Sequence, residues 1–364
     1  MKKFKWLASA ALAAALVAGC GGGGSEKTAN PLGLTSLVSF GDSLSDVGTH
    51  KVGTVLGLAN ATGGGGRWTI NSTTGGELWV ERLSAALALP VPCAAETGLL
   101  PNNGATGAPR TPNTLCRNYA QGSSRVTNPL GPVSVAAQTA LGEQNIGILA
   151  TPMSLQFAAH LKAVGGLYSG KELVTVLAGA NDVFLEAQFV QLALQTPQTA
   201  IANAAVAGTT LGNLVKTEVV AKGAKQVLVL TIPDVAGTPL GVNGGPASQG
   251  LLDALTRAFN DALQAALRGT TGVIVADSYA SNKDQLANPA AYGLSNVRDV
   301  ACGPNAFSNP AGSNGSSLVC NASNTRAGID VSKYLYADDV HPTPFGHQLL
   351  AQFVGKILAT AGWL

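Results

Sequence analysis

Three side chains of this 364-residue sequence have the types that nucleophilic catalysis needs: Ser43, His341 and Asp338. A serine hydroxyl attacks a carbonyl well only when a base takes its proton, and a histidine base works best when a carboxylate fixes its tautomer. Ser43 lies in "VSFGDSLSDVG", between an apolar run and a polar turn. In "YADDVHPT", Asp338 precedes His341 by three residues, so a turn can bring its carboxylate to the ring. Asp339 is the rival partner, although an adjacent residue normally points the other way.

The other three histidines are weaker candidates for the base. His347 lies in a helix-like segment, where a packed or capping role is more common. His50 and His160 have no acidic partner at a useful spacing. We therefore predict His341 as the base.

Acyl transfer also places negative charge on a carbonyl oxygen, which requires hydrogen-bond donors arranged in advance. The candidates are the backbone N–H of Gly122 in "RNYAQGSSRV", the side chain of Asn181 in "LAGANDVF", and the N–H of Ser43 itself. Each also has an ordinary structural interpretation, Gly122 as a turn glycine and Asn181, with Asp182, as a helix N-cap. Together, however, these residues supply a nucleophile, a base, an orienting carboxylate and oxyanion donors.

The elements that must position these residues alternate along the chain between strand-like and helix-like segments. Short apolar runs at 34–40, 171–179, 225–233 and 272–278 indicate buried parallel strands. Amphipathic or apolar stretches at 76–89, 151–166, 200–223, 248–269 and 344–362 indicate helices. The predicted fold class is α/β, with helices on both faces of the sheet. Ligands bind beyond the carboxyl ends of such strands, where Ser43 and Asn181 lie.

One domain is expected from residue 34 to residue 364, because we find no internal repeat and no second linker. Two stretches rich in turn residues, 60–132 and 281–332, are expected to carry loops over the sheet edge. The composition, 46% hydrophobic and 12% charged, suits a folded protein with a sizeable core. Without the three lysines at positions 2, 3 and 5, the chain has 19 basic and 20 acidic residues. This balance argues against a nucleic-acid partner.

The N-terminus, "MKKFKWLASAALAAALVAGC", has the positive start, short apolar stretch and small residues of a signal peptide. Its end, "VAGC", resembles a bacterial lipobox, which predicts removal of residues 1–19 and lipidation of Cys20. An ordinary secretory signal with an incidental cysteine is the alternative. Because Gly21 rather than aspartate follows, we expect outer-membrane sorting, to either the periplasmic face or the cell surface. Residues 20–33 are expected to form the lipidated cysteine and a flexible glycine-rich tether.

Four cysteines remain in the exported domain, an even number that predicts two disulfides in an oxidising compartment. Three connectivities are possible. The short segments rich in glycine, proline and asparagine between neighbouring cysteines favour Cys93–Cys116 and Cys302–Cys320. A metal site is a weak alternative, because neither pair has C-x-x-C spacing and no histidine lies nearby in the sequence.

Four segments resemble, in the same order, the conserved blocks of the GDSL esterases and lipases of the SGNH-hydrolase superfamily. They are "GDSLSDVG", "NYAQGSS", "GAND" and "DDVHPT". The likeness extends to "GRWTINSTTGGELWVERLSAAL", "GAKQVLVLTIPDVAGTP" and "NPAAYGLSNVRDVAC", so it covers nearly the whole mature chain.

The resemblance implies a flavodoxin-like, three-layer α/β/α sandwich with a central, mainly parallel sheet. It implies a serine esterase or lipase that hydrolyses carboxylic esters through an acyl-enzyme, with Ser43 as nucleophile, His341 as base and Asp338 as its orienting partner. It further implies Gly122 and Asn181 as oxyanion donors, and requires neither a cofactor nor a metal.

The resemblance leaves the second oxyanion donor and the substrate open. Relatives often have a second glycine where this chain has Ser123, so the Ser123 N–H can replace that of Gly122. The substrate is a small-molecule or lipid ester, and flat loops at a sheet edge favour short or medium acyl chains. The alternatives are an acyltransferase or lysophospholipase that uses the same triad on membrane lipid, and a carbohydrate O-deacetylase. A binding protein without the chemistry is disfavoured, because Ser43, Asn181 and His341 are all present.

Overall fold

The computed structural model describes residues 30–101, 106–132, 147–308 and 314–364. Within them, the main sheet is parallel, with strand order β1-β4-β5-β6. Its strands are β1 (Ser36–Gly41), β4 (Glu172–Leu177), β5 (Gln226–Leu230) and β6 (Val273–Ala276), which match the four predicted strands. An extended segment lies along the other edge of β1, where the Tyr119 N–H donates to the Ser39 carbonyl at 2.8 Å. This segment brings residue 122 to the carboxyl end of β1.

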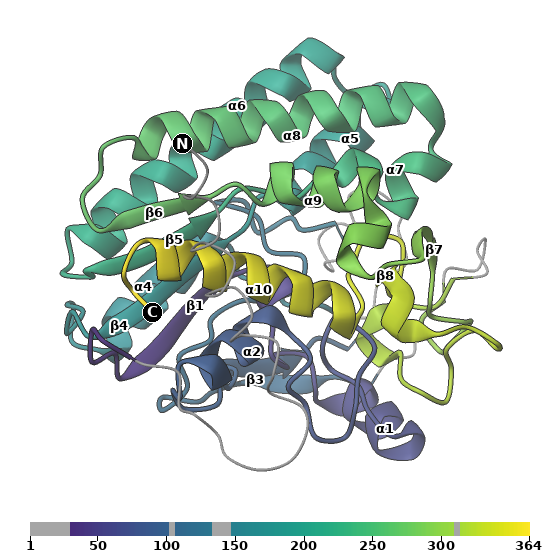
Figure 1. Cartoon of the computed structure of the whole chain (residues 1–364), viewed down its shortest axis with the longest axis horizontal. Helices are drawn as coiled ribbons and strands as arrows, with labels where there is room; N and C mark the ends of the chain where they lie inside the picture. The colour runs from purple at the N-terminus through teal and green to yellow at the C-terminus, as the bar shows by residue number, and fades with distance from the viewer. Residues whose placement is uncertain (1–29, 102–105, 133–146, 309–313) are drawn as a thin grey trace, which may run out of the picture.

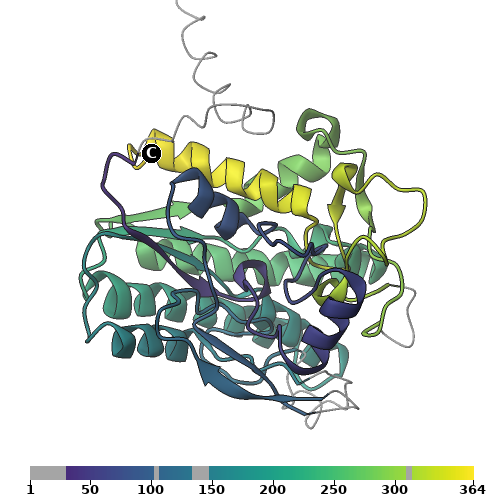
Figure 2. The ribbon, with the colours of Figure 1, turned by 90° about the horizontal axis from the view of Figure 1, so that it is seen from below.

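Alternate strand residues face opposite helical layers. Val38 and Val174 pack toward α4 (Met153–Ala163), α5 (Ala180–Gln191), α6 (Pro197–Leu214) and α8 (Gly245–Leu267). Their neighbours Leu37 and Leu173 pack toward α2 (Trp79–Ala86) and α10 (Pro344–Thr360). Because side chains alternate along a strand, each strand contributes to both cores. The predicted three-layer α/β/α fold is confirmed (Figure 1; Figure 2).

The five predicted helices correspond to α2, α4, α6, α8 and α10. At its end α6 continues into a π-helical turn, Val215–Val220. Among the described residues, four further helices, namely α1 (Gly53–Thr62), α5, α7 (Pro239–Asn243) and α9 (Ser278–Ala287), were not predicted. The sequence of α9, "SYASNKDQLA", has no apolar stripe, and its start is fixed instead by Asp277, whose side chain accepts the Ala280 N–H. Single 3₁₀ turns occupy Ser43–Ser45, Val235–Gly237, Pro289–Tyr292, Ser317–Val319 and Val331–Lys333.

Two small sheets lie in the stretches that the sequence predicted as loops. Strands β2 (Glu96–Leu99) and β3 (Ala108–Pro112) are antiparallel, and β7 (Asn296–Val300) pairs with β8 (Tyr334–Tyr336) in parallel. Both predicted disulfides, Cys93–Cys116 and Cys302–Cys320, are present. The first joins the segments before β2 and after β3, and the second joins the segment after β7 to the end of the turn Ser317–Val319.

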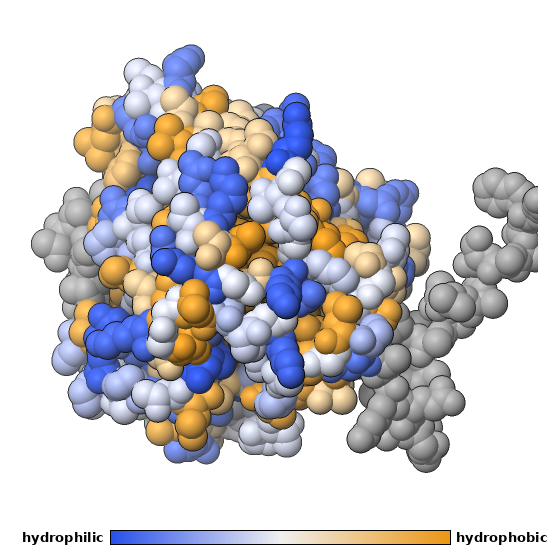
Figure 3. All heavy atoms as spheres, turned by 90° about the vertical axis from the view of Figure 1, so that its left-hand side faces the viewer, coloured by the Kyte–Doolittle hydropathy of each residue, from blue (hydrophilic) through white to orange (hydrophobic). Residues whose placement is uncertain are grey.

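Hydrophilic and hydrophobic side chains are interspersed over the face at the left of Figure 1, which Figure 3 shows from the front. Among the residues that the structure describes, no helix has the length and apolar character needed to cross a bilayer. The predicted signal peptide, Cys20 and most of the tether lie outside the described residues.

Candidate active site

The structure brings Ser43, His341 and Asp338 together at the carboxyl ends of the strands. His341 Nε2 lies 2.8 Å from Ser43 Oγ. On the other side of the ring, Nδ1 lies 2.8 Å from Asp338 Oδ1 and 2.9 Å from Oδ2. All three residues are at least nine-tenths buried. This arrangement can move a proton from the serine hydroxyl to a histidine whose cationic form is stabilised by a carboxylate.

The Asp338 carboxylate is held by backbone donors from two loops. Oδ1 accepts the N–H groups of Val340 and His341, and Oδ2 accepts the Ser317 N–H at 2.9 Å. Burial alone would raise the pKa of Asp338, but the His341 ring and these hydrogen bonds outweigh it and hold the pKa far below its usual value. The rival Asp339 instead accepts a hydrogen bond from the Asn314 side chain at 2.7 Å. Asp338 is therefore the partner of His341.

Ser43 begins a tight turn directly after β1. Asp42 caps this turn, and its Oδ1 accepts the Leu44 N–H at 3.1 Å. Gly41 permits the close approach to β4, because a Cβ there would lie 2.3 Å from the Leu177 carbonyl oxygen. The other oxygen of Asp42, Oδ2, is buried and without a hydrogen-bond partner among the described residues. The strand end thus places a serine and a buried carboxyl side by side.

Asn181 lies in the first turn of α5 rather than at its N-cap, which is Gly179. Its Nδ2 donates to the Ser124 carbonyl at 2.9 Å, which uses one of its two N–H groups. The neighbouring Asp182 accepts the Arg125 Nε–H at 2.9 Å and the Val126 N–H at 3.1 Å. These bonds fasten the segment after residue 122 to α5.

The predicted oxyanion residue Gly122 packs tightly against Trp68, where a Cβ would approach the indole to 2.6 Å. Its N–H donates to Asp46 Oδ2 at 3.0 Å, so this donor already has a partner. Ser123, the alternative, has a φ of +69° and lines the cavity at the site. Glycine adopts that conformation most easily, so the backbone at this position suits the glycine that the resemblance leads one to expect there. The assignment of the second donor stays a prediction.

Sequence reasoning missed the aromatic ring that covers His341. The rings of Trp68 and His341 lie 5.0 Å apart, tilted by 34°, and Thr69 Oγ1 donates to the Pro342 carbonyl at 2.9 Å. The segment "GRWTIN" was the only available signal, and it does not specify which residue the indole contacts.

One expectation about the other histidines was wrong. His50 has an acidic partner, because its Nδ1 lies 3.2 Å from Asp46 Oδ2, and both side chains are fully buried. His347 is also fully buried, and this burial lowers its pKa to about 3. Burial also lowers the pKa of His160, to about 4, with a smaller contribution from Arg117. His347 and His160 are therefore packed, neutral side chains.

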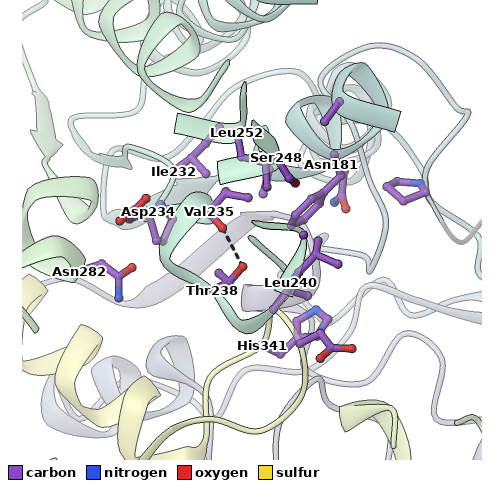
Figure 4. Close-up of a pocket in the computed structure, with 18 of the residues that line it drawn as sticks. Asn181, Ile232, Asp234, Val235, Thr238, Leu240, Ser248, Leu252, Asn282 and His341 are labelled. Atoms are coloured by element: carbon purple, nitrogen blue, oxygen red, sulfur yellow. Dashed lines mark hydrogen bonds between the residues drawn. The ribbon is translucent and has the colours of Figure 1, made fainter. Parts of the chain in front are cut away.

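A cavity of about 1340 Å³ opens beside the candidate residues. Ser43, Asn181 and His341 line it, together with the turn from Val235 to Thr238 and residues of α5 to α9 (Figure 4). Its walls are mostly apolar, as is usual for a small-molecule site. Among the described residues, no group of three or more histidine, cysteine, aspartate or glutamate side chains is placed to hold a metal ion.

Comparison with known proteins gives one family match. The model of the family described as GDSL-like Lipase/Acylhydrolase matches residues 37–354. The chain is 27% identical over 352 residues to an "uncharacterized protein in trpE-trpG intergenic region" of Pseudomonas putida, covering 93% of this chain and 51% of that protein.

Two shorter matches are to named enzymes. Esterase EstA of Pseudomonas aeruginosa is 33% identical over 146 residues, which is 38% of this chain and 20% of EstA. Lipase 1 of Photorhabdus luminescens is 35% identical over 89 residues, which is 24% of this chain and 12% of that lipase. The chain thus spans about half, or less, of the length of these relatives.

The buried carboxyl of Asp42 should make stability depend on pH. Burial raises its pKa from 3.8 to about 7, with smaller opposing effects of the Leu44 N–H and His341. Between these two pH values the folded state holds a proton that the unfolded state has lost, so the free energy of unfolding should fall as pH rises. In the parent, the Asp42 carboxyl should contribute up to about 4 kcal/mol to the decrease in the free energy of unfolding between pH 4 and pH 8, and Asp42→Asn should abolish this contribution. Urea unfolding at pH 4 and at pH 8 measures it.

The matched control is Asp261→Asn, which neutralises an exposed carboxyl on α8. This control should keep the parental pH dependence. An Asp42→Asn protein whose stability changes with pH as steeply as that of the parent would contradict the assignment.

Proposed function

The chain belongs to the GDSL-like lipase/acylhydrolase family, and from this we propose that it hydrolyses carboxylic esters through an acyl-enzyme on Ser43. The observation that carries the proposal is the position of the His341 ring, 2.8 Å from Ser43 Oγ on one side and 2.8 Å from Asp338 on the other. The similarity to an esterase and a lipase supports the same class of reaction.

In the first half-reaction His341 Nε2 takes the Ser43 proton while Oγ bonds to the ester carbonyl carbon. Asp338 stabilises the imidazolium, since its carboxylate faces Nδ1. The carbonyl oxygen becomes negative and accepts a hydrogen bond from the second side-chain N–H of Asn181. The backbone N–H groups of Ser43 and Ser123 are the further candidate donors. Collapse of this intermediate breaks the bond to the alcohol oxygen, which leaves with the proton from His341.

In the second half-reaction water replaces the alcohol. His341 Nε2 takes a proton from the water as its oxygen bonds to the acyl carbon. The second intermediate then collapses, the acid leaves, and the proton returns to Ser43 Oγ. Each residue thus ends in its starting protonation state, and no cofactor enters the sequence.

Removal of the nucleophile tests the proposal directly. We expect Ser43→Ala to lower kcat for p-nitrophenyl butyrate by roughly 10⁴-fold or more, because the other groups cannot form the acyl-enzyme. An organophosphonate probe should label the parent at Ser43. Ser295→Ala, which changes an exposed serine, is the control and should keep parental activity and labelling. Parental activity in Ser43→Ala, or a label on another serine, would show that the mechanism is wrong.

Asn181→Ala separates an oxyanion role from a structural one. If Asn181 donates to the oxyanion, kcat should fall by about a hundredfold or more. Loss of its bond to the Ser124 carbonyl should cost only about 1 kcal/mol of stability. Asp182→Asn is the control, because it weakens the same attachment to α5 without removing the donor. An equal loss of kcat in both variants would mean that Asn181 only holds the loop.

We further propose that the mature protein is anchored to the outer membrane by lipid on Cys20. The support is the sequence "VAGC" with the glycine-rich tether after it. A single acyl chain binds a membrane only marginally. Each buried methylene adds about 0.8 kcal/mol to the free energy of membrane binding, so the several chains expected on such a cysteine give firm attachment.

Cell fractionation tests the anchor. The parent should be recovered with the outer membrane, and Cys20→Ser should be recovered in the soluble periplasmic fraction, with parental activity on p-nitrophenyl butyrate as the control for folding. Recovery of Cys20→Ser with the membrane, to the same extent as the parent, would rule out the lipid anchor.

A further inference from the structure

The cavity at the candidate site extends well beyond the space that the reacting ester group needs. Its volume of about 1340 Å³ exceeds the roughly 300–1,000 Å³ typical of small-molecule sites. An acetyl or butyryl group would leave most of its walls without contact. The chemical character of the residues that line the cavity therefore indicates what kind of substrate it binds.

One wall is a stripe along α5 that starts beside Asn181. Ala180, Phe184, Ala187 and Gln191 line the cavity at helical spacing, so they lie on one face of the helix. From the first to the last of them the helix rises about 16 Å. The first three side chains are apolar and only partly buried, although they pack against the main core. An apolar surface formed by Ala180, Phe184 and Ala187 thus extends along α5, away from Ser43.

The facing walls come from α6 and α8. Ile201 of α6 lines the cavity, as do Ala247, Leu251 and Ala254 of α8, again at spacings of three and four residues. Alanine at two of these positions leaves space where larger side chains would close the gap between the helices. Apolar residues of three helices therefore line one space.

Polar side chains also line the cavity, and they include Gln188 and Gln191 of α5 and Ser248 of α8. In Figure 4, Asp234 and Asn282 are on the opposite side of the turn from Val235 to Thr238 relative to Asn181. A sugar placed beside Ala180, Phe184 and Ala187 would face apolar side chains and would leave hydroxyl groups without partners there, at a cost for each. Methylene groups in the same place gain free energy from burial.

We infer that the space between α5, α6 and α8 binds the acyl chain of medium- to long-chain fatty-acyl esters, and that Ala187 and Ala254 set the length it accepts. This inference rests on the proposed function. The leaving alcohol must lie at His341 Nε2, which protonates it, so the acyl part extends away from His341 and along α5. The expectation of short acyl chains from flat loops overlooked this space, which the packing of distant helices creates.

The test is the rate of hydrolysis of p-nitrophenyl esters, from butyrate through octanoate to laurate, below their critical micelle concentrations. Each methylene buried can raise kcat/KM by up to about fourfold, so we expect a rise of at least about tenfold from butyrate to laurate in the parent. Ala254→Trp should lower the laurate-to-butyrate ratio at least about tenfold, because the indole fills the space. Ala265→Trp, which changes an exposed alanine of the same helix, is the matched control and should keep the parental ratio.

If Ala254→Trp does not fold, as judged by circular dichroism, the smaller change Ala187→Leu should lower the same ratio. If the parent hydrolysed butyrate but its kcat/KM fell from butyrate to laurate, the acyl-chain site between α5, α6 and α8 would be ruled out. The proposed function would still stand. Equal ratios in Ala254→Trp and Ala265→Trp would also rule out the acyl-chain site. If purified, folded protein hydrolysed none of the esters, the proposed function itself would fail, and the acyl-chain site with it.

Discussion

The site depends on the cost of burying the Asp338 carboxylate. A buried anion is tolerated only when hydrogen bonds and a cation or dipole compensate for the lost water. Here the donors are the His341 ring, two N–H groups of the same turn and the Ser317 N–H from a separate loop. That loop ends at Cys320, whose disulfide to Cys302 ties it to the segment beside β8. The long stretch before β8 is therefore part of the site's support.

The same requirement organises the other side of the site. Asp46 is buried and accepts the N–H groups of Gly48, Thr49 and Gly122, which joins the turn after Ser43 to the segment along β1. Asp182 does the same between that segment and α5. Each loop that carries a candidate residue is thus fixed to its neighbour by a buried carboxylate. Such shared bonds hold side chains within the narrow limits that proton transfer needs.

Local patterns in the sequence were enough to predict the four strands of the main sheet, five of the helices and the pairing of His341 with Asp338. A run of apolar residues indicates a buried strand directly. Asp338 and His341 are only three residues apart, so a single turn is enough to bring them together. The contact of Trp68 with His341, and the pairing of His50 with Asp46, were missed. The first joins residues far apart in the sequence, and the second spans a turn whose shape the sequence did not reveal. The cavity was missed because it is the space between α5, which was not predicted, and two predicted helices, α6 and α8.

The bond between His341 and Ser43 joins residues 298 positions apart, close to the full span of the domain. A contact between residues so far apart in the sequence requires a long loop to close, and closing it costs conformational entropy, which disfavours early formation of the contact. A nascent chain carries Ser43 directly after its first strand but lacks His341, which comes just before the last helix, until synthesis is nearly complete. The hydrogen bond between His341 and Ser43 can therefore form only after the strands of the main sheet have been synthesised. The order of the elements along the chain keeps Ser43 apart from His341 until the fold is nearly complete.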